Sequence, residues 1–533
     1  MNKTKNNSLI VTAKNTKIQK NFSSIILFMV AIISFVIGLL AIIKTAYFNL
    51  VINFANEKTS IKLDNIFLNI IFTLIIIGFF YFLYKKILPK INKKILFILM
   101  LVFSLSIGFW WVNYIKFRPI ADQSLVVYCA EKFLDHDVKT ILEPGEYLNR
   151  NPHQLGFVVY LMTIFKIFNT RNPIVAQNLA VLYSAISEII LYFIVKEIFE
   201  EDIVHKIALI FIIFFSIYFA FFCTHVYGNI PGLMFGLIAL LFTLKFLESN
   251  KYWHLAIVAV TITISYLLKS NYEIFLFAIV IELLLKALKD WNIKNVFTAI
   301  VLFILVFGLK SILYNHFEKA TGYSLDTGVP MTSYIYMGIA EPVTLTPGWY
   351  TGDVEIIYNQ SGYDSKKSEE ITEEVLKNRL KYLASNPKYT YDFFKNKLQT
   401  TWLNPTFQVF WCSTPSTLLD LDPAYNSRIA PKKLLISILC GRAYNIEERA
   451  MDIYQILIFL SASLALFTIF KEGSLKRMLL PIIFLGGFIF HFIWETKAIY
   501  VLQYFYLLLP YAAFGLYKLL LLIDNKIKNK LEQ

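Results

Sequence analysis

The polar residues that could support chemistry lie in short interruptions of a very apolar chain. The longest interruption in the first half spans residues 117–157, and Asp122 follows an apolar run that ends at Ile115. This spacing predicts a carboxylate at the membrane surface, ionised at neutral pH if its pKa is an ordinary ~3.9. Such a group could accept a proton from a hydroxyl while a glycosidic bond forms. A helix cap or a solvated loop acid is the alternative role.

Two lysines at the ends of apolar segments could bind a phosphate. Lys269 and Lys497 each carry an ammonium group that could form a charge-assisted hydrogen bond to a lipid-linked phosphate. Snorkelling to the interface is the alternative for both. Lys497 belongs to the turn ETKAIY, with Glu495 and Tyr500 beside it, and this turn is too short to serve only as a linker.

Two histidines could join this chemistry. His153 follows Pro152 in the motif NPHQLGF, and His225 precedes the motif YGN. With Asp122 they could ligate a divalent cation, but they lack the close spacing of a metal motif, and hydrogen bonding to sugar hydroxyls suits them as well. The four cysteines show no CxxC spacing, so we expect unpaired buried thiols, although Cys412 and Cys440 could pair.

The elements that position these residues are membrane helices. With 57% hydrophobic residues and a mean hydropathy of +0.57, the chain has more apolar surface than a soluble core could bury. Apolar runs predict about twelve crossings. They lie near residues 24–45, 66–84, 95–115, 173–195, 207–224, 230–247, 253–270, 272–288, 296–315, 451–470, 478–494 and 499–522. The shorter run 154–168 is expected to lie along the interface or to dip into the membrane and return.

Charge orients these crossings. Residues 1–22 and 85–94 each hold five lysines and no acid, as expected of cytoplasmic segments. Twelve crossings then place both termini in the cytoplasm and the chemical residues outside a cell membrane. The outer segment 316–449 holds 14 basic and 15 acidic residues, which argues against nucleic acid as a partner.

The chain divides into four regions by these patterns. They are residues 1–94 (tail and two additional helices), 95–315 (membrane module with outer loop 116–153), 316–450 (extracytoplasmic domain) and 451–533 (last helices and tail). The outer domain is predicted to be mixed and mainly helical. Its Gly- and Pro-rich start near residues 324–353 indicates loops with short strands, and residues 371–402 indicate a helical hairpin that covers the membrane domain.

Several short motifs together resemble the GT-C glycosyltransferases. They are the first outer loop with Asp122, NPHQLGF, YGNIPG, LLKSNYEI and ETKAIYVLQYFYLLLP. The chain looks most like the bacterial branch akin to protein O-mannosyltransferases and aminoarabinose transferases, over about residues 95–522. The resemblance implies a GT-C-like fold and transfer of a sugar, with inversion, from a polyprenyl-phosphate donor to a cell-envelope polymer, lipid or protein on the outer face.

The resemblance also implies roles for residues. Asp122 matches the catalytic acid of the family's first loop, whereas Gln123 and Asn229 stand where the family often carries further acids. Because both differences remove potential metal ligands, we expect no cofactor, with a divalent metal the less favoured alternative. The expected donor- and substrate-binding residues are Arg118, Gln123, His153, Gln154, His225, Asn229, Lys269, Glu495, Lys497 and Tyr500.

A flippase or transporter of a lipid-linked sugar is the alternative function. Glu188 and Glu282 lie within apolar segments, where an ionised carboxylate costs roughly 2.5–3.5 kcal/mol. They could form a transport path with the lysines, or they could be structural pairs. The hydropathy pattern lacks inverted halves, and transport does not require a large outer domain.

Overall fold

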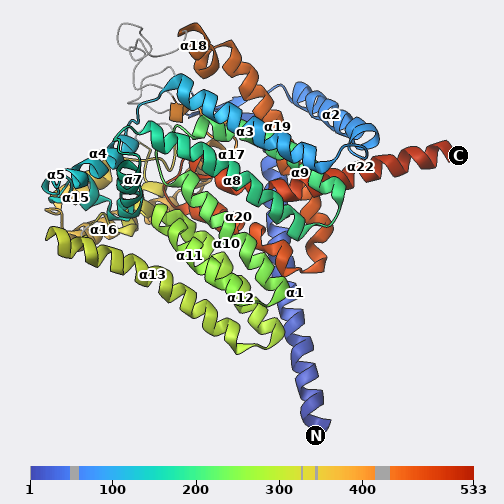
Figure 1. The fold of residues 1–533 in the computed structure, drawn as a ribbon, viewed down its shortest axis with the longest axis horizontal. Coiled ribbons are helices and arrows are strands. Elements are labelled where there is room, and N and C mark those ends of the chain that lie inside the picture. Colours follow the sequence, from blue (N-terminus) through green and yellow to red (C-terminus); the bar gives the residue numbers. More distant parts are fainter. Residues whose placement is uncertain (1, 49–58, 326–327, 343–345, 414–431, 533) are drawn as a thin grey trace.

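The computed structural model describes residues 2–48, 59–325, 328–342, 346–413 and 432–532. Within these ranges the protein is a bundle of long apolar helices with shorter helices gathered at one end (Figure 1). The only sheet in the described residues is one antiparallel hairpin, β1 (Lys44–Phe48) with β2 (Thr59–Leu63). The predicted class, an all-α polytopic membrane protein, is confirmed.

All twelve expected crossings fall on helices. Nine helices of the described residues are long and apolar enough to cross a membrane, Trp253–Leu268 is a shorter apolar helix, and Glu273–Asp290 and Leu509–Glu532 do not meet this measure. The twelve elements are α1 (Asn2–Ile43), α2 (Ile66–Phe82), α3 (Lys93–Ile115), α8 (Ile174–Ile198), α9 (Asp202–Phe222), α10 (Asn229–Ser249), α11 (Trp253–Leu268), α12 (Glu273–Asp290), α13 (Ile293–Thr321), α19 (Arg442–Ile469), α20 (Leu475–Ile493) and α22 (Leu509–Glu532).

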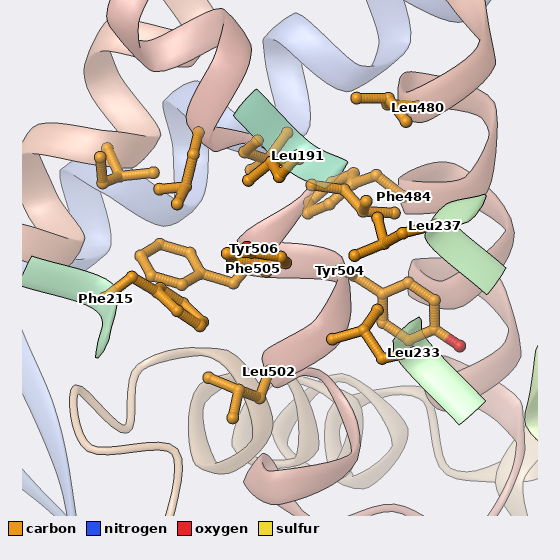
Figure 2. Close-up of a cluster of buried hydrophobic side chains, with 14 of the residues drawn as sticks. Leu191, Phe215, Leu233, Leu237, Leu480, Phe484, Leu502, Tyr504, Phe505 and Tyr506 are labelled. Atoms are coloured by element: carbon orange, nitrogen blue, oxygen red, sulfur yellow. The ribbon is translucent and has the colours of Figure 1, made fainter. Parts of the chain in front are cut away.

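The last apolar segment is broken where it enters the core. A short helix, α21 (Leu502–Tyr506), precedes α22, and Pro510 in the first turn of α22 lacks the amide hydrogen needed to continue one helix across the junction. The α21 side chains are buried among residues of α8, α9, α10 and α20 (Figure 2). The turn that precedes α21 is therefore anchored to the centre of the bundle.

The first helix is part of the bundle packing. α1 lies against α19, α20 and α12, and a Cβ atom added at Gly38 would come within 2.7 Å of the Leu460 side chain. The Ser463 hydroxyl also donates a hydrogen bond to the Ala31 carbonyl at 2.9 Å. These contacts join α1 to the bundle, and whether the first two helices are an addition to the membrane module stays a prediction.

Short helices build the end of the bundle that carries the polar loops. The first loop contains α4 (Asp122–Leu134), α5 (Lys139–Leu142), α6 (Tyr147–Arg150) and α7 (Leu155–Ile167). At 13 residues α7 is about 20 Å long, too short to cross a membrane, in agreement with the interfacial helix expected there. By contrast α13, with 29 residues, extends past residue 315 to a left-handed cap at Gly322.

The outer segment is helical both in its Gly- and Pro-rich start and in the predicted hairpin. The predicted short strands near residues 324–353 are wrong for the described residues, which form α14 (Met331–Ile339) and the start of α15 (Asp353–Gln360). Pro330 precedes α14 and fits the start of a helix, where its missing amide hydrogen is not needed. The predicted hairpin is confirmed as α16 (Ser365–Ser385) and α17 (Pro387–Trp402), separated at Asn386.

The outer segment rests directly on the first loop. The Tyr358 hydroxyl donates to Asn149 Oδ1 at 3.1 Å, and the Val329 amide donates to the Arg150 carbonyl at 3.0 Å. Both chain ends lie away from α4, α15 and α16 (Figure 1). Cys129 and Cys223 are buried free thiols, as expected, and Cys412 is also buried. The side chain of Cys440 lies outside the described residues, so its pairing with Cys412 stays untested.

Candidate active site

Asp122 is the first residue of α4 and points away from the packed face of that helix. The chain leaves α3 through a left-handed residue, Lys116, and enters α4 through Ala121, whose φ is 50°. The α4 residues that face α7 are buried, whereas Asp122 is exposed. The amide groups of a helix N-terminus favour a negative charge, so this position suits a carboxylate.

Three cations from separate elements act on the Asp122 carboxyl group. They are Lys269 after α11, Lys497 before α21, and Arg150 at the end of α6. Although Asp122 reaches solvent, the protein around it removes part of the hydration of its carboxyl group and so raises its pKa, and these three cations only partly oppose that effect. The expectation of an ordinary pKa is therefore wrong. A carboxylate with a raised pKa is a stronger base than an exposed one.

Close backbone approach places Lys269 beside Asp122. A Cβ atom added at Gly228 would lie 1.8 Å from the Leu268 carbonyl oxygen, and one added at Gly156 would lie 2.0 Å from the Leu267 oxygen. Only glycine allows the second loop and α7 to lie this close to the end of α11. Lys269 Nζ lies 4.3 Å from the centre of the Tyr227 ring. Burial lowers the Lys269 pKa to about 8, although Glu495 and Asp122 oppose this shift.

The turn that carries Lys497 is fixed by the outer segment. The Glu495 amide donates to the Tyr334 carbonyl at 3.1 Å, and the Thr496 amide donates to the Gly348 carbonyl at 2.8 Å. Lys497 Nζ lies 5.2 Å from the Trp349 ring centre and 5.4 Å from that of Trp411. Two aromatic rings from the outer segment thus hold this ammonium group by cation–π contacts.

A buried lysine also anchors this turn. Lys397 of α17 donates to the carbonyl oxygens of Gly338 at 2.6 Å and Trp494 at 2.8 Å, and it is 1% exposed. Burial lowers the Lys397 pKa to about 7, and Glu495 opposes this shift. Burial likewise raises the Glu495 pKa, which the cations Lys497 and Lys269 oppose.

The two histidines are uncharged at neutral pH. Burial, reinforced by nearby lysines that include Lys269, lowers the pKa of both His153 and His225 to about 3. Gln154 Nε2 lies 3.1 Å from His153 Nε2 and donates to the Tyr227 hydroxyl. Neutral imidazoles and an amide can exchange hydrogen bonds with sugar hydroxyls, which both donate and accept.

Two of the expected substrate-binding residues lie inside the scaffold. Gln123 is 2% exposed, and its Oε1 accepts a hydrogen bond from the Val226 amide at 2.9 Å, which joins the first outer loop to the second. Asn229 is the first residue of α10, and its carbonyl accepts from the Tyr272 hydroxyl at 2.6 Å. Both residues hold loops in place through these contacts. Their expected role in substrate binding stays a prediction.

The remaining expected residues differ in their distance from the carboxylate. Tyr500 lies near Lys269, since the centre of the Tyr500 ring is 6.0 Å from Lys269 Nζ. Arg118 is exposed in the segment before α4, and it is not among the cations that act most strongly on Asp122. Arg150 is instead one of the cations that act on Asp122, and it forms an ion pair with Glu355 at 2.5 Å.

Sequence reasoning missed Arg150, Lys397 and the tyrosines around the site. Tyr147 and Tyr227 hydrogen-bond through their hydroxyl groups and are both near Asp122. Arg150 directly precedes the motif NPHQLGF, and this adjacency was the one available signal. The described residues contain no group of three or more His, Cys, Asp or Glu side chains that could hold a metal ion. The expectation that no cofactor is needed stays a prediction.

The acids within the membrane helices have local surroundings only. Glu188 accepts a hydrogen bond from the Ser216 hydroxyl at 2.8 Å. Glu282 is fully buried, and neither of its oxygens has a partner in the described part of the chain. These contacts give no path that joins either acid to the lysines of the site.

One family comparison bears on the class of protein. Residues 156–313 match the family described as dolichyl-phosphate-mannose-protein mannosyltransferase. The match spans α7 to α13 and includes Lys269, whereas Asp122 and Lys497 lie outside it. No curated protein matches the chain. Together with the polytopic helical fold, the match supports a membrane glycosyltransferase of the GT-C-like type, a class that uses a lipid-linked sugar donor.

Proposed function

We propose that the chain transfers a sugar from a polyprenyl-phosphate donor to an acceptor hydroxyl on the extracytoplasmic face, with inversion, and that Asp122 is the general base. The observation that carries the proposal is that Asp122, Lys269 and Lys497, which come from three distant loops, meet at one end of the bundle. The similarity to a mannosyltransferase family over residues 156–313 supports the same reaction class.

The charges of the site fit this reaction. The acceptor oxygen attacks the anomeric carbon, its proton passes to Asp122, and the bond from that carbon to the phosphate oxygen breaks. Negative charge thereby moves from the Asp122 carboxylate to the departing polyprenyl phosphate, and the total charge stays constant. Because Lys269 and Lys497 already lie near Asp122, they can stabilise the phosphate as it gains charge. A single displacement without a covalent intermediate inverts the anomeric centre.

The other polar groups have supporting roles in this proposal. Gln154, the two neutral histidines and Tyr227 would hydrogen-bond the sugar hydroxyls. Transfer would proceed without a metal ion, so we expect chelation by EDTA to leave the rate unchanged. The basic segments 1–22 and 85–94 would face the cytoplasm of a cell membrane, with both termini inside.

The test uses purified protein, a panel of labelled polyprenyl-phosphate sugars and a crude envelope fraction as acceptor. Transfer with release of polyprenyl phosphate supports the proposal. Asp122→Asn keeps the side-chain shape but cannot take up the proton, so we expect normal folding, retained donor binding and a rate at least about a hundredfold lower. Because burial raises the Asp122 pKa, the wild-type rate should also fall as the pH decreases through that pKa.

The same experiment separates the flippase alternative. A flippase would move labelled donor across vesicle membranes without bond cleavage, and Asp122→Asn would not separate binding from turnover. Near-normal transfer by Asp122→Asn would remove Asp122 as the base. Glu495, which shares Lys269 and Lys497 with it, would be tested next, followed by Glu131 and Asp135 of the first loop.

A further inference from the structure

A polar cavity lies between the β1–β2 hairpin and the first turns of α19. In the hairpin Thr45 is opposite Lys62, so the alternation of side chains places Thr45, Tyr47, Lys62 and Asp64 on one face. The outer edge of β1 is fixed by backbone contact, because the Ala46 amide donates to the Leu403 carbonyl at 2.8 Å. The hairpin is therefore a supported wall.

The opposite wall is the polar start of a long helix. The α19 helix has 28 residues and is about 42 Å long, whereas the hydrocarbon core of a membrane is about 30 Å thick. Its first turns can therefore extend beyond the membrane. Asn445, Glu448, Arg449 and Asp452 recur there at helical spacing and share the face toward the hairpin.

These two walls enclose a cavity of about 220 Å³. Because one water occupies about 30 Å³ of liquid, the cavity has room for several waters or one small polar molecule. Its lining is Thr45, Tyr47, Lys62, Asp64, Asn445, Glu448, Arg449 and Asp452. None of these residues belongs to the group around Asp122.

One lining carboxylate is incompletely bonded. Asp452 is 2% exposed, and its Oδ2 accepts from Arg449 Nη1 at 3.2 Å, whereas its Oδ1 has no protein partner in the described residues. Buried polar atoms in folded proteins nearly always have a hydrogen-bond partner. A donor from a bound molecule would complete this set.

The other lining groups identify the kind of molecule. The lining combines three carboxyl groups with the cations Lys62 and Arg449, so it offers both hydrogen-bond acceptors and donors. No group of three or more His, Cys, Asp or Glu side chains within the described ranges could hold a metal ion. A neutral polyhydroxyl compound suits this mixed lining. Each of its hydroxyl groups can donate to a carboxyl group and accept from an ammonium, guanidinium or amide group. Tyr47 adds an aromatic ring to the lining, and Lys62 Nζ lies 3.5 Å from the centre of that ring.

We infer that this cavity is a second carbohydrate-binding site, which holds one neutral sugar unit apart from the site of Asp122. The inference stands on the cavity and does not require the transfer reaction. If transfer occurs as proposed, a sugar bound here could belong to a glycan acceptor or to a finished product.

The experiment is saturation-transfer difference NMR on the purified full chain with a panel of neutral methyl glycosides. We expect at least one glycoside to bind. Glu448→Gln replaces one carboxyl oxygen by an amide nitrogen that cannot accept a hydrogen bond, so the dissociation constant should rise about two- to tenfold. Asn445→Ala lies at an exposed position, where loss of folding is not expected, and should also weaken binding. Glu374→Gln, an exposed charge change on α16, is the matched control and should bind as the wild type does.

Asp122→Asn distinguishes the two sites. We expect this variant to bind the glycoside normally, because Asp122 does not line the cavity. Loss of the signal in Asp122→Asn with retention in Asn445→Ala and Glu448→Gln would place the sugar at the proposed transfer site and overturn the inference. Absence of binding by the wild type across the panel would overturn it as well. Failure of transfer, with this binding intact, would contradict only the proposed function.

Discussion

Donor binding is expected to weaken as the pH rises from 7 to 9, and Lys269 is the reason. Burial lowers its pKa from 10.5 to about 8, so the ammonium form dominates below that value and is lost above it. About nine-tenths of the side chain is protonated at pH 7 and about one-tenth at pH 9. If only the charged form binds the donor phosphate, the dissociation constant should rise about tenfold over this range.

Equilibrium binding of a labelled polyprenyl-phosphate sugar, measured at pH 7, 8 and 9, tests this expectation. Lys269→Arg keeps its charge throughout, so its binding should not depend on pH in this range. Lys269→Ala should bind about ten- to a hundredfold more weakly at pH 7, because a charge-assisted hydrogen bond is worth about 1.5–3 kcal/mol. Lys497→Arg, which leaves Lys269 in place, is the control and should keep the wild-type pH dependence.

Two results would refute this reasoning. Constant wild-type affinity from pH 7 to 9 would show that the Lys269 ammonium does not contribute to donor binding. A pH dependence that persists in Lys269→Arg would assign the titration to another group, and Lys397, with a pKa of about 7, would be examined next.

Three further predictions concern the turn before α21 and the orientation of the chain. Lys497→Ala should weaken donor use about ten- to a hundredfold, and unchanged kinetics would show that the Lys497 ammonium group does not contribute to donor binding. Lys397→Met leaves two buried carbonyls without a donor, so thermal unfolding in detergent should show a loss of about 1–3 kcal/mol, and an unaltered midpoint would contradict the anchoring role. In intact cells an impermeant thiol reagent should label Lys366→Cys but not Lys90→Cys, and the reverse pattern would invert the topology.

Local sequence patterns were sufficient for the helical framework. Apolar runs of membrane length predicted the nine helices of the described residues that could cross a membrane, because a chain in lipid must satisfy its backbone hydrogen bonds within each helix. The break at Asn386 was readable for a similar reason, since Pro387 fits only the first turn of a helix. The Gly- and Pro-rich start of the outer segment predicted short strands, but in the described residues it flanks the helices α14 and α15.

The sequence also placed Asp122, Lys269 and Lys497 at the outer ends of helices, since polar residues next to apolar runs must lie near the membrane surface. Only the tertiary structure decided how these residues meet. Arg150 and Lys397 had no motif of their own, and their roles arise from contacts between segments distant in the chain. The pKa shifts have the same origin, because burial depends on how the loops and the outer segment pack together, and no local pattern records that packing.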